Sequence, residues 1–360
     1  MPADGTAALV ISLDFELHWG VHDKRSVEAY RGNLLGVRAA VPAMLALFRE
    51  FAVHATWATV GFLFFESKRE LLDGLPSRRP AYARGELSPY GLLSSVGENE
   101  REDPFHFAPS LIRRIAETPH QELGTHTFSH YHCLEAGQSP ADFRADLEAA
   151  TTVMQRKLGR SPRSIVFPRN QTTAACIAEC GAMGLTAYRG NLPAWIYRER
   201  PDGDESFLRR GIRLADAYLA LSGRNASRVG PATGTGPTDV PASRYLRPYT
   251  AALRQLEPLR LRRITADLGH AATSGRTYHL WWHPHDFGVH LDENLQVLCQ
   301  ILTCFDELRD RYGMESRTME EAATFARGAG PVVRQDSTVV DIQSRGPSPH
   351  HPRRGAAMRS

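Results

Sequence analysis

The stretch Glu122-Leu123-Gly124-Thr125-His126-Thr127-Phe128-Ser129-His130 places two histidines four residues apart, directly after a short run that is typical of a strand. Residues four apart lie on one face of a helical turn, so we expect both imidazoles to reach one metal ion. Two histidines are only half of such a site, because zinc needs at least one more protein ligand. In a chain with 15 histidines the pair alone can be coincidence, so the missing ligand has to be sought elsewhere.

Two other apolar runs also end in polar residues. In the first, period-two alternation puts Asp14 and Glu16 on the same side of a strand: Ile11-Ser12-Leu13-Asp14-Phe15-Glu16. The second ends in two histidines: Leu280-Trp281-Trp282-His283-Pro284-His285-Asp286-Phe287. Polar groups at the ends of well-separated strands are typical of the active site of an α/β protein. We therefore expect the three stretches to meet.

Taken together, these stretches resemble the polysaccharide deacetylase family, the NodB-homology or carbohydrate esterase family 4 type. That family has an Asp-Asp motif on its first strand, a His-[Ser/Thr]-x-x-His motif, a proline-containing motif and a late Leu-x-His motif. The corresponding stretches here are Leu13-Asp14-Phe15-Glu16, His126-Thr127-Phe128-Ser129-His130, Phe167-Pro168-Arg169-Asn170-Gln171 and Leu280-Trp281-Trp282-His283. The first and third depart from the usual form.

The resemblance implies an α/β fold, a distorted parallel (β/α) barrel of about seven strands. Alternation of strand-like and helix-like patterns supports parallel strands with right-handed crossovers. The expected strands cover residues 8–15, 54–61, 122–125, 164–167, 185–188 and 277–282. The expected helices cover residues 37–52, 109–118, 140–158, 173–183, 206–222 and 291–308, with a short one starting at 316.

The domain prediction is one catalytic domain over residues 1–328. Two segments rich in Gly, Pro and polar residues, about 68–107 and 223–243, are expected to be surface loop insertions. Residues 329–360 have the composition of a disordered C-terminal tail.

Composition excludes several classes of protein. A net charge of +3 with mixed signs gives no reason to expect a nucleic-acid partner. Five cysteines at irregular spacing argue against a disulfide framework. No apolar run reaches the length of a membrane span, and the N-terminus lacks the pattern of a signal peptide. We therefore expect a cytoplasmic protein with reduced thiols.

The resemblance also implies a divalent metal, with zinc as the expected ion, and assigns its ligands. His126 and His130 match the metal-binding pair of the family. In the Asp-Asp motif the first Asp resembles a general base and the second a metal ligand. Asp14 matches the first, but Phe15 stands at the second position and Glu16 is the nearest carboxylate. We assign Asp14 as base and Glu16 as third ligand, and the reverse assignment stays open.

His283 matches the general-acid histidine of the family. Val166 stands where the family has an arginine, so Arg169, which we assign as catalytic, or alternatively Arg189 is expected to hold the base carboxylate. The residues expected to contact substrate are Trp19, Pro168, Asn170, Arg189 and His285.

The predicted function is metal-dependent removal of N-acetyl groups from a sugar of a cell-surface polysaccharide or its precursor. The expected cytoplasmic location favours a lipid- or nucleotide-linked precursor. Two alternatives stay open. One is an allantoinase-like hydrolase of cyclic amides on the same scaffold. The other is an inactive carbohydrate-binding homologue, which the altered positions Phe15 and Val166 suggest.

Overall fold

The computed structural model of the chain describes residues 6–328 apart from 193, 199–200, 202–206 and 231–235. The expected disordered tail, residues 329–360, lies outside the described residues. No helix in the described part is long and apolar enough to cross a membrane.

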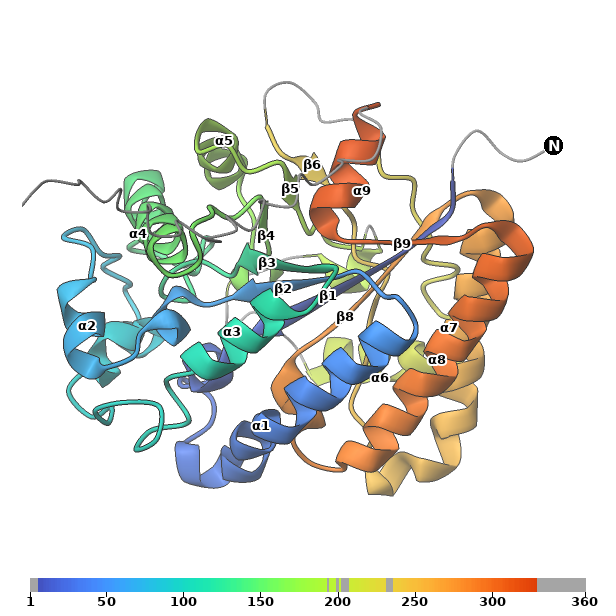
Figure 1. The fold of residues 1–360 in the computed structure, drawn as a ribbon, viewed down its shortest axis with the longest axis horizontal. Helices are drawn as coiled ribbons and strands as arrows, with labels where there is room; N and C mark the ends of the chain where they lie inside the picture. Colours follow the sequence, from blue (N-terminus) through green and yellow to red (C-terminus); the bar gives the residue numbers. More distant parts are fainter. Residues whose placement is uncertain (1–5, 193, 199–200, 202–206, 231–235, 329–360) are drawn as a thin grey trace, which may run out of the picture.

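A single sheet forms the centre of the molecule (Figure 1), and all its strand pairs are parallel. The strand order is β6-β5-β4-β3-β2-β1-β8-β7, and β9 pairs with the start of β1. The strands are β1 (Ala8–Phe15), β2 (Ala55–Thr59), β3 (Gln121–Thr125), β4 (Ser164–Ile165), β5 (Ala187–Tyr188), β6 (Thr238–Asp239), β7 (Arg244–Tyr245), β8 (Thr277–Trp282) and β9 (Glu315–Arg317).

One chain segment joins the two ends of this sheet. β6 pairs with β5, β7 pairs with β8, and only residues 240–243 separate β6 from β7. Within that connection the Val240 N–H donates to the Tyr188 carbonyl at 2.9 Å, and the Ser243 N–H donates to the His279 carbonyl at 2.8 Å. The sheet therefore curls round into a distorted barrel, and the predicted α/β fold with parallel strands is confirmed.

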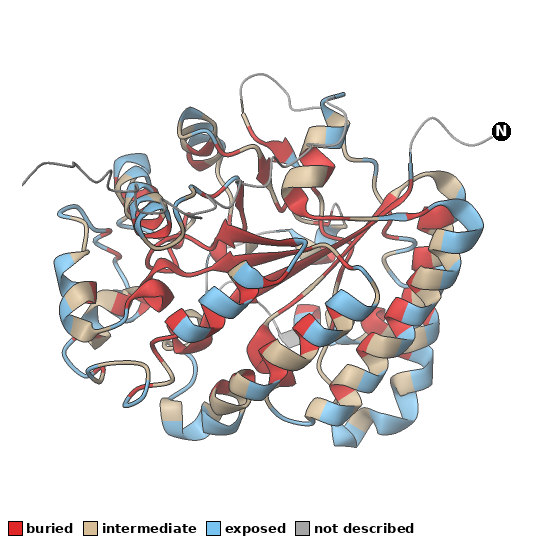
Figure 2. Cartoon of the chain, viewed as in Figure 1, coloured by how far each residue is buried: buried red, intermediate tan, exposed pale blue. Residues whose placement is uncertain are grey.

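The helices cover the outside of the sheet, and Figure 2 shows their buried faces turned toward it. They are α1 (Val27–Glu50), α2 (Lys68–Asp73), α3 (Pro109–Glu117), α4 (Pro140–Leu158), α5 (Ala174–Ala182), α6 (Phe207–Leu219), α7 (Glu257–Ser274), α8 (Leu291–Tyr312) and α9 (Met319–Ala326). Capping residues in the sequence fix the ends of several helices. The Ser139 hydroxyl accepts from the Asp142 N–H at the start of α4, and Gly159 ends that helix with a φ of 68°.

Both expected insertions contain parts of the fold. The segment 68–107 holds α2 and short 3₁₀ turns, and it buries Leu71, Leu87 and Phe107 completely. The segment 223–243 contains β6 and the connection to β7, so its described residues are not simply a surface loop. Strands of two residues have no room to display a period-two pattern, which is why the sequence did not reveal them.

The central strand carries the residues that matter for function. β1 pairs with β2 on one side and with β8 on the other, and all eight of its residues are buried. Side chains of a strand alternate between faces, so Leu13 and Phe15 enter the apolar core while Ser12 and Asp14 face the other way. A polar strip therefore runs inside the barrel toward the carboxyl end of β1.

Candidate active site

Four strands deliver polar side chains to one end of the barrel. Asp14 and Glu16 come at the end of β1, His126 directly after β3, Arg189 after β5 and His283 after β8. The chain segment after β4 passes the same region. In a parallel barrel all carboxyl ends open onto the same side, so residues far apart in sequence meet there.

Glu16, His126 and His130 form a buried cluster whose ligand atoms lie within 4.8 Å of one another. One oxygen of Glu16 lies 3.2 Å from Nε2 of His126 and 3.1 Å from Nε2 of His130. The other ring nitrogen of His126, Nδ1, bonds the Val166 carbonyl at 2.8 Å. Because a carbonyl only accepts, Nδ1 carries the proton, and Nε2 of the neutral ring keeps its lone pair.

The segment from His126 to His130 is not a helical turn, so that part of the prediction is wrong. Thr127 and His130 have φ values of 64° and 58°, in the left-handed region. The carboxylate of Asp146 holds this turn by accepting the N–H of Phe128 at 2.7 Å, the N–H of Ser129 at 3.2 Å and the Ser129 hydroxyl. A capped loop, not helical periodicity, brings the two imidazoles together.

This donor set fits a divalent metal ion. Burial, opposed in part by Glu16, lowers the pKa of His130 to about 4, so its ring is neutral at physiological pH. Burial alone would raise the pKa of Glu16, but the positive charge of His283 outweighs it and holds the pKa well below its ordinary value. A lone pair on His126 then faces a carboxylate oxygen, and two acceptors at this distance repel unless a cation lies between them. Two neutral imidazoles and one carboxylate are the ligands of many catalytic zinc sites.

Packing explains why Glu16 and not residue 15 reaches this cluster. Phe15 is 1% exposed and meets Trp57 edge to face, with ring centroids 6.4 Å apart. The Glu16 side chain occupies the space beside Gly20, where an added Cβ would stand 2.0 Å from the Glu16 carboxyl carbon. The absence of a side chain at residue 20 therefore lets the carboxylate turn toward the histidines.

Arg189 holds the carboxylate of Asp14 with both of its terminal nitrogens. Nη1 and Nη2 each lie 2.7 Å from a different carboxylate oxygen. Burial would raise the pKa of Asp14, but the guanidinium of Arg189 outweighs it, with smaller help from His283, and the pKa is lowered. Asp14 is therefore ionised near neutral pH, in an orientation fixed by a bidentate contact.

The other contacts of Arg189 form a hydrogen-bond network inside the barrel. Its Nη1 also donates to the Ser12 hydroxyl at 3.0 Å, and that hydroxyl lies 2.8 Å from Nε2 of His279. Nδ1 of His279 bonds the Val240 carbonyl at 3.0 Å, so Nε2 accepts the Ser12 proton. Each group thus donates or accepts in a consistent direction, which keeps the buried arginine in place.

His283 lies on the opposite side of the cluster from the histidine pair. Its Nδ1 bonds Asp286 at 3.0 Å, so Nε2 is turned toward Glu16 and Asp14, at 3.8 and 4.0 Å. Burial disfavours the imidazolium, but Glu16, Asp286 and Asp14 outweigh it and raise the pKa of His283 to about 10. The hydroxyl of Tyr245 donates to the same Asp286 oxygen at 2.7 Å and fixes its position.

Of the two arginines considered for Asp14, Arg189 makes the contact and Arg169 does not. The Arg169 guanidinium bonds Asp23 at 2.6 Å instead, and its backbone has a φ of 55°. The expectation that Arg169 holds the Asp14 carboxylate is therefore wrong, and Arg189, the alternative, makes that contact. Asn170 accepts from Arg189 at 2.9 Å.

Three of the expected substrate contacts are buried. Trp19 is 0% exposed and its indole N–H donates to the His106 carbonyl at 2.9 Å, so it is a core residue. His285 is 3% exposed and lies parallel to His283 with ring centroids 4.9 Å apart. Pro168 is also buried, at the start of a short 3₁₀ turn. None of the three side chains faces open space, and their contact with substrate stays a prediction.

Sequence reasoning missed the residues that position the site. Asp146 lies in α4, sixteen residues after His130, and nothing local links it to the histidines. Asp286 follows His283 by three residues and forms a reciprocal capping box with it, a spacing that could have been recognised. Ser12 lies in β1 and His279 in β8, two strands that are far apart in the sequence and become neighbours only in the folded chain.

The space beside Gly20 gives a first prediction. Gly20→Ala should displace the Glu16 carboxylate, and metal affinity should fall about 10-fold or more, as for other changes that disturb a ligand's orientation. Calorimetric titration of metal into stripped protein measures this. Gly91→Ala is the matched control, because an added Cβ at residue 91 meets nothing within 4 Å. Equal affinity in both variants would contradict the role of Gly20.

Comparison with known proteins supports the relationship indicated by the motifs. Residues 32–188 match a family model described as polysaccharide deacetylase. No curated protein sequence matches the chain significantly. The matched region contains the histidine pair but not Asp14, Glu16 or His283, which only the fold brings to the same place.

Solved structures share the fold at low sequence identity. A protein of Mycobacterium smegmatis assigned to the polysaccharide deacetylases is 14% identical, with a TM-score of 0.58 over 90% of this chain and 92% of that one. Puue allantoinase is 10% identical, with a TM-score of 0.50 over 90% of each chain. A 4-alpha-glucanotransferase from Thermococcus litoralis is 12% identical, with a TM-score of 0.50 over 89% of this chain and 40% of that one. The match over residues 32–188 confirms the predicted resemblance to polysaccharide deacetylases, and the solved structures confirm the fold.

Proposed function

We propose that the protein is a metal-dependent hydrolase that removes N-acetyl groups from a sugar of a cell-surface polysaccharide or its precursor. The observation that carries this proposal is the Glu16, His126 and His130 cluster, with Asp14 and His283 close beside it. The match of residues 32–188 to the polysaccharide deacetylase family model supports the reaction class. We expect the ion to be zinc, held by these three residues.

Each nearby residue has a role in amide hydrolysis. A divalent ion bound at such a site acidifies a water molecule and polarises the substrate carbonyl. Asp14 is ionised and fixed by Arg189, so it is suited to accept the proton of the attacking water. The lowered pKa of Asp14 limits its strength as a base, which is why it needs a water that is already acidic.

His283 is suited to the second proton transfer. Its Nε2 faces the same space as the Asp14 carboxylate, and Asp286 holds its Nδ1 proton. A raised pKa keeps the ring protonated at neutral pH, so it can give a proton to the departing amine. The base and the acid are thus two separate groups, each oriented by a partner of opposite charge.

An alternative reaction on this scaffold is the opening of a cyclic amide. The observation that favours this alternative is the fold shared with Puue allantoinase. A deacetylase releases acetate, whereas ring opening releases no small acid. Acetate measured enzymatically after incubation with N-acetylated sugars therefore separates the two reactions.

Metal content gives the next prediction. Protein purified without chelator should contain about one equivalent of zinc or a similar ion per chain, and His126→Ala and His130→Ala should each lose most of it, because either change removes one of three ligands. Elemental analysis measures the content. His270→Ala, on α7, is the control and should keep its metal. Full occupancy in both site variants would overturn the proposed metal site.

Substitutions of Glu16 and Asp14 should have different effects on metal affinity and on turnover. Glu16→Gln should lose metal affinity, because it removes a charged ligand. Asp14→Asn should keep the metal and lose turnover by about 10²–10⁴-fold, the usual contribution of one acid–base group. Metal titration and acetate release, measured on both variants, test this. The opposite pattern would mean that Asp14 is the ligand.

His283→Ala should bind metal and fold normally, while kcat falls by about 10²–10⁴-fold. The wild-type rate should decline at high pH as the His283 imidazolium, whose pKa is raised, loses its proton, and this decline should vanish in the variant. Rate against pH for the folded fraction measures both effects. A variant that keeps the wild-type rate and the high-pH decline would exclude His283 from the reaction.

A further inference from the structure

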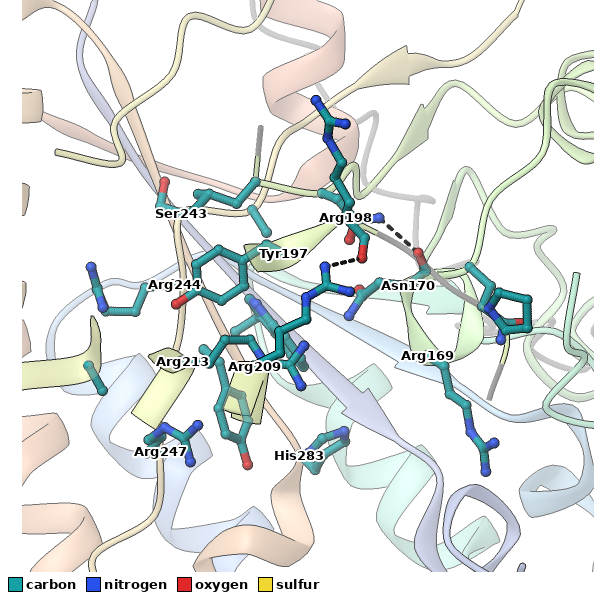
Figure 3. A pocket seen from close by; sticks show the side chains of 18 of the residues that line it. Arg169, Asn170, Tyr197, Arg198, Arg209, Arg213, Ser243, Arg244, Arg247 and His283 are labelled. Atoms are coloured by element: carbon teal, nitrogen blue, oxygen red, sulfur yellow. Dashed lines mark hydrogen bonds between the residues drawn. The ribbon is translucent and has the colours of Figure 1, made fainter. Parts of the chain in front are cut away.

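A pocket of about 440 Å³ opens beside His283 (Figure 3), within the size range of small-molecule sites. Its walls come from α6, from the segments after β4 and β5, and from β7 and β8. His283 and Trp281 border the pocket on the side of the metal-ligand cluster. A sugar whose acetamide reaches Asp14 and His283 would therefore extend into this pocket.

The lining of the pocket is strongly basic. Among the lining residues that the structure describes, seven carry a positive charge and none carries a carboxylate: the seven are Lys24, Arg169, Arg198, Arg209, Arg213, Arg244 and Arg247. Arg169 and Arg244 have acidic partners outside the lining. Arg169 pairs with Asp23, and Arg244 pairs with Asp267 at 3.3 Å. The walls facing the pocket are thus positive, in a protein whose net charge is only +3.

Two arginines of the lining have no carboxylate within ion-pair distance in the described part of the chain. These are Arg198, which is exposed, and Arg247, which is half-buried and lies over the Tyr245 ring, 5.9 Å from its centroid. Tyr245 in turn binds Asp286, the residue that orients His283. The positive charge of Arg247 therefore lies close to His283, the proposed general acid.

Arg209 is held rigidly at the pocket wall. Its guanidinium donates to the carbonyls of Ile196, Trp195 and Arg198 at 2.8, 3.0 and 2.6 Å. Figure 3 shows Arg209 and Arg213, both from α6, above and to the left of His283, and Arg247 at the lower left of the view. Guanidinium groups fixed in advance lose little conformational freedom when an anion binds.

We propose that this basic pocket binds a phosphate or diphosphate group through which the substrate sugar is linked to a carrier. Arginine matches the geometry of phosphate oxygens, and a diphosphate carries more charge for this many cations than a single carboxylate does. The identity of the acetylated sugar rests on the proposed function, but the anion site does not. The phosphate chemistry is shared by nucleotide-linked and lipid-linked sugars.

Calorimetric titration of the full chain with inorganic pyrophosphate, UDP and farnesyl diphosphate tests the proposal without any turnover. We expect binding by at least one of them that weakens steeply with salt. Tighter binding of UDP than of pyrophosphate supports a nucleotide carrier, and tighter binding of farnesyl diphosphate supports a lipid carrier. Glucuronate, a sugar carboxylate without phosphate, is titrated for comparison. Absence of binding of all three phosphate compounds at millimolar concentration, or binding of glucuronate alone, would overturn the phosphate site.

Two variants and one control locate the binding. Arg198→Ala and Arg247→Ala should each weaken pyrophosphate binding about 10-fold, the usual loss for a charged hydrogen-bond partner. Arg254→Ala changes an exposed arginine outside the lining and should bind as the wild type. Wild-type affinity in both pocket variants, with melting temperatures unchanged, would contradict the proposal.

Repeating the titration on His126→Ala separates the pocket from the metal site, since phosphates also bind metal ions. Retained binding in that variant supports the arginine pocket, and its complete loss would assign the binding to the metal and overturn the pocket. A chain that binds pyrophosphate but releases no acetate from any N-acetylated sugar would keep the anion site and reject the proposed function. The two claims therefore fail separately.

Discussion

The ion pair between Asp14 and Arg189 is the interaction on which the arrangement of this site depends. Both groups are buried, at 3% and 1% exposure. Two charges leave water at considerable cost, which is offset only when geometry and additional hydrogen bonds are good. Both Asp14 oxygens are engaged and the guanidinium also reaches Ser12 and Asn170. Removing either partner would leave the other charged and uncompensated inside the barrel.

At both positions where the sequence departs from the motifs of the resembling family, a residue elsewhere in the chain supplies the missing charged group. Phe15 has joined the apolar core, and the next residue, Glu16, turns its carboxylate toward the histidines beside Gly20. Val166 keeps a role through its backbone, because its carbonyl orients His126. The positive charge that Val166 lacks comes instead from Arg189, one strand further along the sheet. The altered motifs therefore do not by themselves indicate an inactive protein.

Much of the fold could be predicted, because long or strongly patterned segments identify themselves. The largely buried run of β8 matches its predicted bounds, and Ser139 and Gly159 mark both ends of α4. The missed elements have physical reasons. β6 and β7 have two residues each, too few for a pattern, and α7 carries many arginines on its faces, some of them buried. Side-chain direction was least predictable, because tertiary packing decides whether Trp19 faces the core or a pocket.

The central claim is that Glu16 takes the place of the usual second aspartate as a metal ligand. The most direct measurement is a crystal structure of the zinc-loaded protein, with anomalous scattering to identify the ion. Our account predicts one ion bonded to Glu16 and to Nε2 of His126 and His130, at about 2.0–2.2 Å, with Asp14 still paired to Arg189. An ion bonded to Asp14, with Glu16 turned away from it, would contradict the account.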